Sequence, residues 1–125
     1  MCGIGGILVT GTGHADPGLL GDSLMRRGRF GRGLFTDGPL SLHSARHAVI
    51  ALDNAEQPLH DSTRSFVMVG NGEVLNYRDL IPTLAPGRRS ALRPGDLQVA
   101  LEMFAEEGRA AFERLRGPFA LAVWD

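Results

Sequence analysis

Cysteine occurs once in this chain of 125 residues, at Cys2. A single cysteine excludes an internal disulfide and a cysteine-rich zinc site. The histidines offer no substitute set of ligands, because His14, His43, His47 and His60 are scattered without metal-ligand spacing. The sequence therefore predicts no metal site.

Excess charge of one sign and long apolar runs are also missing. The formal net charge is -1 at pH 7, without the basic excess that a nucleic-acid partner usually requires. The apolar start at residues 4–9 is too short for a membrane span and lacks the charged flank of a signal peptide. We therefore expect one soluble, cytoplasmic domain without a nucleic-acid or membrane partner. Three acidic residues are expected to be solvated surface charges: Asp61, Glu106 and Glu107.

Apolar segments separated by turn residues predict a mixed fold. Extended segments are expected at residues 4–10, 34–37, 40–52, 66–70 and 119–124, and helices at residues 17–26, 76–84, 96–107 and 110–115. The pair Asp16-Pro17 is typical of a helix start, and Asn71-Gly72 of a tight turn with positive φ. The glycine-rich segment 28–33 is expected to be irregular. This order of elements indicates an α+β or a layered α/β/β/α fold with mainly antiparallel strands.

The position of Cys2 is the strongest chemical signal. If Met1 is removed after translation, which the small side chain of Cys2 permits, the first residue carries both a thiol and a free α-amine. A thiolate is a strong nucleophile, and an α-amine with a pKa near neutrality can accept its proton without a histidine. This arrangement suits acyl transfer by an N-terminal nucleophile. The alternative is that Cys2 is a small buried residue that happens to follow the initiator.

Four stretches occur in the order found in one known family. They are CGIGGIL at residues 2–8, Arg46 eleven positions before Gln57-Pro58, NGEVLNY at residues 71–77 and LRGPFALAVWD at residues 115–125. In these stretches the chain resembles the glutamine-hydrolysing domain of the asparagine synthetase family, whose members are class II glutamine amidotransferases. The resemblance implies the layered α/β/β/α fold of N-terminal nucleophile hydrolases. The last two stretches favour asparagine synthetases over phosphoribosyl and aminosugar amidotransferases.

The resemblance also implies which groups carry out glutamine hydrolysis. Cys2 would supply the nucleophile and the base, through its thiol and its amine. The side-chain amide of Asn71 and the backbone N–H of Gly72 would donate to the oxyanion, and losing one such donor typically costs about 2.7–4 kcal/mol of transition-state stabilisation. An ordinary Asn-Gly turn is the alternative for this pair. No histidine is expected to be catalytic.

Three further residues are implied in binding the amino-acid part of glutamine. The planar guanidinium of Arg46 would bind the α-carboxylate in a bidentate manner, unless Arg46 is an ordinary surface residue of a strand. Asp96, at the start of a helix, would bind the α-ammonium together with Glu73. Asp96 also suits a second role, because aspartate is a favoured N-cap residue.

The chain departs from the family pattern in three places. An acidic Pro-Asp-Asp-Glu-Gly loop of the family is replaced by the basic segment Arg29-Phe30-Gly31-Arg32-Gly33, and Ser-Asp-Thr-Glu-Val by Gly95-Asp96-Leu97-Gln98-Val99. The chain also stops at Asp125, where the family continues with further strands and then an ATP-using synthetase domain. We therefore expect a glutaminase domain over residues 1–125 that lacks its C-terminal strands and has no synthetase domain.

Together these features predict a glutaminase that releases ammonia from L-glutamine through a Cys2 thioester. A synthetase domain or subunit would be its partner and would pass the ammonia to an activated carboxylate such as aspartate. No cofactor is expected on this chain, since ATP and magnesium would be needed only on the synthetase. The main alternative is a non-catalytic module, glutamine-binding or structural, that keeps the fold and needs a partner chain. The sequence also allows a fragment that folds poorly by itself, or an N-terminal nucleophile hydrolase that acts on a different amide.

Overall fold

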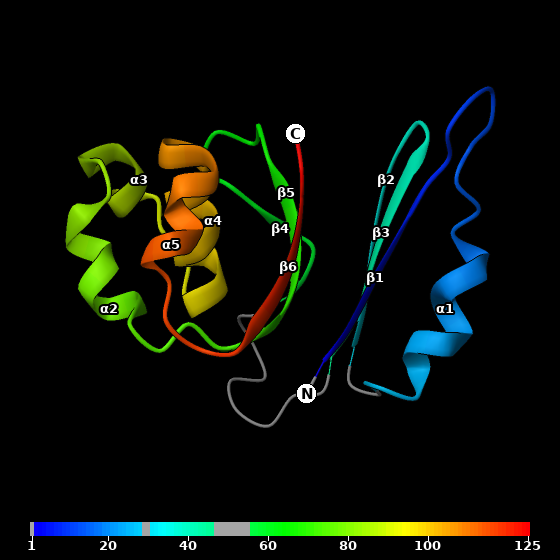
Figure 1. Ribbon diagram of the computed structural model, residues 1–125, viewed down its shortest axis with the longest axis horizontal. Coiled ribbons are helices and arrows are strands. Elements are labelled where there is room, and N and C mark those ends of the chain that lie inside the picture. Colours follow the sequence, from blue (N-terminus) through cyan, green and yellow to red (C-terminus); the bar gives the residue numbers. More distant parts are fainter. Residues whose placement is uncertain (1, 29–30, 47–55) are drawn as a thin grey trace. The chain divides into compact units, whose positions relative to one another are not determined.

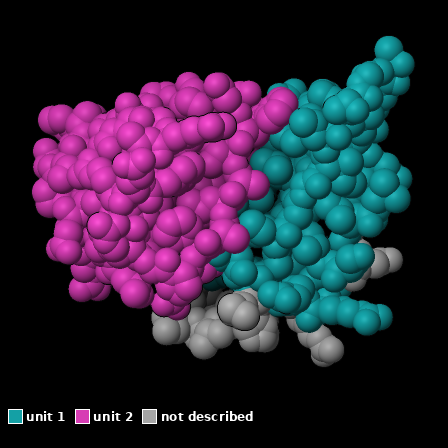
Figure 2. Space-filling view, in the orientation of Figure 1, with its two compact units in different colours: residues 1–58, 69–71 teal, residues 59–68, 72–125 magenta. Residues whose placement is uncertain are grey.

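The computed structural model describes residues 2–28, 31–46 and 56–125. The chain divides into two compact units, Met1–Pro58 with Val69–Asn71 and Leu59–Met68 with Gly72–Asp125 (Figure 2). Helices and strands both occur, which confirms the expected α+β class (Figure 1). The layering of an N-terminal nucleophile hydrolase stays a prediction. Among the helices in the described ranges, none combines the length and the apolar character that crossing a bilayer requires.

The first unit contains a three-stranded antiparallel sheet in the order β1-β3-β2. Its strands are β1 (Gly3–Leu8), β2 (Gly31–Asp37) and β3 (Leu40–Arg46). The central strand β3 is buried along nearly its whole length. The helix α1 (Gly18–Met25) packs against β1 and β3, and lies within the range predicted for it (Figure 1). Its N-cap is Pro17 rather than Asp16, whose Oδ1 accepts a hydrogen bond from the N–H of Gly18 at 2.8 Å.

The prediction of an irregular segment at residues 28–33 was wrong at its C-terminal end. β2 begins at Gly31, which lies opposite Arg46 of β3. Pairing with β3 therefore holds residues 31–33 in an extended conformation, although this glycine-rich segment lacks the alternation of apolar and polar side chains that is typical of a strand. The strand predicted at residues 40–52 reaches Arg46, and residues 47–52 lie outside the described part of the chain.

The second unit combines a small sheet with several short helices. Its strands lie in the order β4 (Leu59–His60), β5 (Val67–Gly72) and β6 (Phe119–Trp124), with residues 69–71 of β5 grouped with the first unit. The helices are α2 (Tyr77–Leu80), α3 (Pro86–Ser90), α4 (Asp96–Glu107) and α5 (Ala111–Arg114), and the 3-10 turns are η1 (Ile81–Thr83) and η2 (Gly108–Ala110). In Figure 1 these helices gather on one side of the strands.

The sequence predicted the long elements of this unit better than the short ones. α4 and β6 match their predicted ranges, and the helix predicted at 76–84 is divided into α2 and η1. The sequence did not predict α3, whose first residue is Pro86. Proline suits that position, since the first helical N–H needs no partner within the helix.

One face of α4 supplies the centre of the core. Val99, Ala100 and Met103 are fully buried. They belong to a cluster with residues from the segments before and after α4: Val74, Leu80, Leu84, Ala111 and Leu115. Because a fully buried apolar side chain stabilises the fold by about 1.5–3 kcal/mol, this cluster holds α4 firmly. Asp96, the first residue of the helix, is fixed with it.

Candidate functional site

Cys2 and Arg46 come to the same end of the sheet in the first unit. In the antiparallel pair of β1 and β3, Gly3 lies opposite Ala45. Cys2 directly precedes Gly3 and Arg46 directly follows Ala45, so the two residues lie at the same end of neighbouring strands. Both are half-buried, and the Cys2 thiol is free of any disulfide. This placement suits a nucleophile beside a cation that binds a carboxylate.

The backbone that leads to Asn71 is held by a side chain from the Gln-Pro pair. Gln57 Nε2 donates a hydrogen bond to the carbonyl oxygen of Gly70 at 2.8 Å, and Gln57 Oε1 accepts one from the Gly70 N–H at 2.7 Å. The amide thus pairs with Gly70 as a neighbouring strand would. Gly70 is the residue before Asn71, so Gln57 restrains the proposed oxyanion donor from one side. Sequence reasoning used the Gln-Pro pair only as a family marker and missed this contact.

Gly72 sits where the backbone has room only for a glycine. Its φ is +132°, in the region that favours glycine, which confirms the positive φ expected from the Asn-Gly pair. The expected tight turn was wrong, because Asn71 and Gly72 are the last two residues of β5. A Cβ atom there would lie 2.1 Å from the carbonyl oxygen of Pro118. That same oxygen accepts a hydrogen bond from the N–H of Glu73 at 2.9 Å. The third family stretch therefore contacts the fourth through the backbone.

Gly117, in the fourth family stretch, likewise lies against the backbone of the third. Its φ is +138°, and a Cβ atom there would lie 2.1 Å from the carbonyl oxygen of Glu73. The N–H of Leu75 donates to the carbonyl oxygen of Arg116 at 2.7 Å. Because Gly72 and Gly117 have no side chains, segments 72–75 and 116–118 can cross at hydrogen-bonding distance.

The side chain of Asn76 closes this crossing. Its Nδ2 donates to the carbonyl oxygen of Arg114 at 2.9 Å, and its Oδ1 accepts from the N–H of Arg116 at 2.9 Å. The second asparagine of the NGEVLNY stretch is therefore structural, while the first is the predicted oxyanion donor. The sequence marks both asparagines only as parts of the NGEVLNY stretch, and that match does not distinguish a structural asparagine from a catalytic one.

Asp96 lies beside the backbone of the same segment. Its Oδ2 accepts a hydrogen bond from the N–H of Val74 at 2.6 Å. The N-cap of α4 is Gly95, so the interpretation of Asp96 as the N-cap residue was wrong. A carboxylate oxygen receiving an N–H is a strong, charge-assisted contact. It brings Asp96 to within one residue of Glu73, whose side chain is exposed.

Asp61 corrects another expectation, that it would be a solvated surface charge. Its side chain is buried and pairs with Arg88 at 3.1 Å, and the same guanidinium pairs with the buried Glu102 at 2.7 Å. Burial alone would raise the pKa of Asp61, but hydrogen bonds from Thr63, Phe66 and Arg88 outweigh it and lower the pKa to about 2. The other two acidic residues also have partners. Glu106 Oε1 accepts a hydrogen bond from the N–H of Ala85 at 2.7 Å and lies 3.8 Å from Arg88 Nε, and Glu107 pairs with Arg114.

The predicted site residues therefore lie in two groups. Cys2 and Arg46 come together in the first unit, and Gly72, Glu73 and Asp96 come together in the second. Asn71 belongs to the first unit and is joined to Gly72 by a peptide bond. Their roles in binding and catalysis stay predictions.

Three glutamine-hydrolyzing asparagine synthetases are similar in sequence to this chain. The glutamine-hydrolyzing asparagine synthetase 2 of Bacillus subtilis is 26% identical over 132 residues, which cover 100% of this chain and 17% of that protein. The glutamine-hydrolyzing asparagine synthetase 1 of the same species is 28% identical over 82% of this chain and 16% of its own length. Asparagine synthetase B of Escherichia coli, also glutamine-hydrolyzing, is 30% identical over 82% of this chain and 18% of its own length.

The chain thus spans less than a fifth of the length of these relatives. A family model described as a glutamine amidotransferase domain matches residues 1–125. That match covers all of the residues discussed above, from Cys2 to the crossing near Gly117. The chain belongs to the glutamine amidotransferase domain family, and its relatives include asparagine synthetases.

Proposed function

We propose that the chain hydrolyses the side-chain amide of L-glutamine with Cys2 as the nucleophile. The observation that carries this proposal is the meeting of Cys2 and Arg46 at one end of the β1–β3 pair. A glutamine whose α-carboxylate binds Arg46 would have its amide within one side-chain length of that anchor. Removal of Met1 frees the α-amine that serves as the base.

The chemistry proceeds through a thioester. The α-amine of Cys2 takes the thiol proton, and the thiolate adds to the amide carbon of glutamine. The C–N bond then breaks, and the leaving nitrogen takes the proton back from the amine and departs as ammonia. Water adds to the γ-glutamyl thioester, the amine accepts one of its protons, and the C–S bond breaks to give glutamate and the free thiol.

Asn71 and Gly72 would stabilise the negative oxygen in both steps. Their backbone is restrained on one side by the Gln57–Gly70 pair and on the other by the Glu73–Pro118 hydrogen bond. Donors that are fixed before the reaction need no reorganisation as charge develops, which makes their stabilisation of the transition state larger.

Asp96 and Glu73 would bind the α-ammonium of glutamine. One oxygen of Asp96 accepts the N–H of Val74. A carboxylate has about four lone-pair sites, so this contact leaves capacity for an ammonium. The charge on Asp96 then distinguishes glutamine from simple amides.

The ammonia would pass to an acceptor activated on a synthetase domain or subunit. The relatives are asparagine synthetases, which favours aspartate as the acceptor. ATP and magnesium would act there and not on residues 1–125, which we propose to be the glutaminase domain. A cytoplasmic location would suit this substrate.

Glutamate release from L-glutamine tests this proposal, with the intact mass recorded for each sample. With Met1 absent, we expect turnover that Cys2→Ala abolishes, with an unchanged thermal transition. Cys2→Ser keeps the shape of the residue with a poorer nucleophile and should retain only a trace of activity. Glutamine binding without turnover in a sample that lacks Met1 would instead identify a non-catalytic glutamine-binding module.

A further inference from the structure

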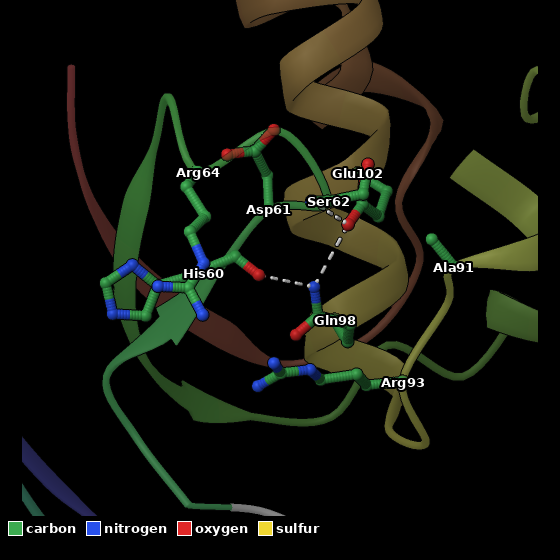
Figure 3. Close-up of a pocket in the computed structure, with 8 residues that line it drawn as sticks. All are labelled: His60, Asp61, Ser62, Arg64, Ala91, Arg93, Gln98 and Glu102. Atoms are coloured by element: carbon green, nitrogen blue, oxygen red, sulfur yellow. Dashed lines mark hydrogen bonds between the residues drawn. The ribbon is translucent and has the colours of Figure 1, made fainter. Parts of the chain in front are cut away.

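The second unit contains a polar pocket that none of the proposed glutaminase residues line. It has a volume of about 200 Å³ and lies between β4, the segment that follows it, the end of α3 and one face of α4 (Figure 3). Its charged and polar walls include His60, Asp61, Arg64, Arg93, Gln98 and Glu102. Pockets for drug-sized ligands are about 300–1,000 Å³. This one therefore has room for a small metabolite.

Gln98 presents an unused acceptor to this pocket. The residue is 2% exposed. Its Nε2 donates to the carbonyl oxygen of His60 at 2.9 Å and to Glu102 Oε1 at 3.2 Å, and these two acceptors fix which way the amide points. Within the described part of the chain, Gln98 Oε1 has no hydrogen-bond partner. Figure 3 shows this oxygen turned away from the His60 carbonyl and toward the side where Arg93 lies.

The carboxylates of the pocket wall are already engaged. Arg88 pairs with both Asp61 and Glu102, and the N–H and hydroxyl of Ser62 donate to the two oxygens of Glu102. The lining guanidinium groups of Arg64 and Arg93 add two positive charges, and both residues are exposed. Since Arg88 already pairs with Asp61 and Glu102, the guanidinium groups of Arg64 and Arg93 are the lining charges that a ligand can meet.

We propose that this pocket binds an acidic α-amino acid, a molecule with two carboxylates, one ammonium and a net charge of -1. The ammonium donates to Gln98 Oε1. The two carboxylates pair with Arg64 and Arg93, whose forked geometry suits such groups. A buried carbonyl without a partner is rare in folded proteins, and this ligand would complete it. The pocket is separate from Cys2, so the proposal does not depend on glutaminase activity.

The test is a titration of the full chain with L-glutamate and with L-aspartate, followed by NMR through the side-chain amide of Gln98. We expect saturable shifts of that amide and of the Ser62 N–H. Succinate, which has two carboxylates and no ammonium, should bind about tenfold more weakly or worse. Absence of saturation with both amino acids, or equal affinity for succinate, would overturn the proposal.

Matched variants separate this site from the proposed glutaminase site. Arg93→Ser and Arg64→Ser should each weaken binding about tenfold or more, whereas Arg109→Ser, an exposed arginine of η2, should not. Cys2→Ala should leave the affinity unchanged. If affinity falls in Cys2→Ala but persists in Arg93→Ser and Arg64→Ser, the ligand occupies the proposed glutaminase site and the pocket is not its site.

Discussion

Gln57 holds Gly70 through both ends of its side-chain amide, donating to the carbonyl at 2.8 Å and accepting from the N–H at 2.7 Å. The next residue along the chain is Asn71, the proposed oxyanion donor. A side chain that restrains the backbone of a catalytic group acts on the transition state without touching the substrate. Gln57 is therefore a positioning residue in the proposed mechanism.

Substituting Gln57 should separate turnover from substrate binding. Gln57→Leu removes both hydrogen bonds and should lower the free energy of unfolding by about 1–3 kcal/mol. We expect kcat for glutamate release to fall by about tenfold or more with little change in KM. Gln57→Glu keeps the acceptor for the Gly70 N–H but places a carboxylate oxygen against the Gly70 carbonyl, so it should also lose stability. A tenfold rise in KM with an unchanged kcat would contradict a positioning role.

The crossing at Gly72 and Gly117 predicts a strong intolerance of side chains. Gly72→Ala and Gly117→Ala would each place a Cβ 2.1 Å from a carbonyl oxygen, at a backbone φ that other residues rarely adopt. Each should lower the free energy of unfolding by about 3 kcal/mol or more.

Gly87→Ala is the matched control for these two variants. A Cβ at Gly87 would meet nothing within 4 Å, and the residue lies in α3. Alanine there should be neutral or stabilise the chain by about 0.5–1 kcal/mol. Urea unfolding of the three variants decides the matter, and equal effects at all three positions would contradict the close approach.

The Asp61–Arg88 pair predicts a loss of stability in acid. The pKa of Asp61 is about 2 in the folded chain, against an ordinary value of 3.8. Because the unfolded chain binds this proton more readily, the stabilisation is present above about pH 4 and is lost as the pH falls toward 2. The shift corresponds to about 2 kcal/mol at neutral pH.

Asp61→Asn tests this linkage. At pH 7 the substitution should lower the free energy of unfolding by about 2–4 kcal/mol, because it also unpairs one side of Arg88. The difference from the unsubstituted chain should shrink as the pH falls from 4 to 2. Glu113→Gln, at an exposed position, should change stability little at any pH. A difference for Asp61→Asn that stays constant with pH would exclude the lowered pKa.

Asp96 allows its structural and binding roles to be measured apart. Asp96→Asn retains an oxygen for the N–H of Val74 but loses the negative charge, so stability should change little while KM for glutamine rises about tenfold or more. Asp96→Ala loses both and should also unfold about 1–2 kcal/mol more easily. An unchanged KM in Asp96→Asn would remove Asp96 from the proposed substrate contacts.

Local sequence signals predicted the elements whose stability is local. α4 has apolar residues at helical spacing from Leu97 to Phe104, and its range matches the predicted one to the residue. The strand predicted at 34–37 is shorter than β2 because Gly31 to Gly33 have no alternation and are extended only by pairing with β3. The two-residue β4 is too short to carry any periodic signal.

Side-chain partners far apart in the chain could not be predicted. Asp61 is buried rather than solvated, and its cationic partner Arg88 lies 27 residues away, beyond any local pattern. The residues of the candidate site were identified from four stretches that resemble a known family, and such a resemblance does not give the distances between side chains. The roles of Gln57 and Asn76 become visible only once Gly70 and Arg116 are seen beside them.

The crossing between segments 72–75 and 116–118 also has a kinetic consequence. Its contacts join residues 38 and 40 positions apart at Asn76, and contacts of such separation form late in folding. The amides of Glu73 and Leu75 donate to this distant segment, so both should exchange with solvent whenever residues 116–118 detach. The backbone after Asn71 is thus rigid only while the segment that leads into the last strand stays in place.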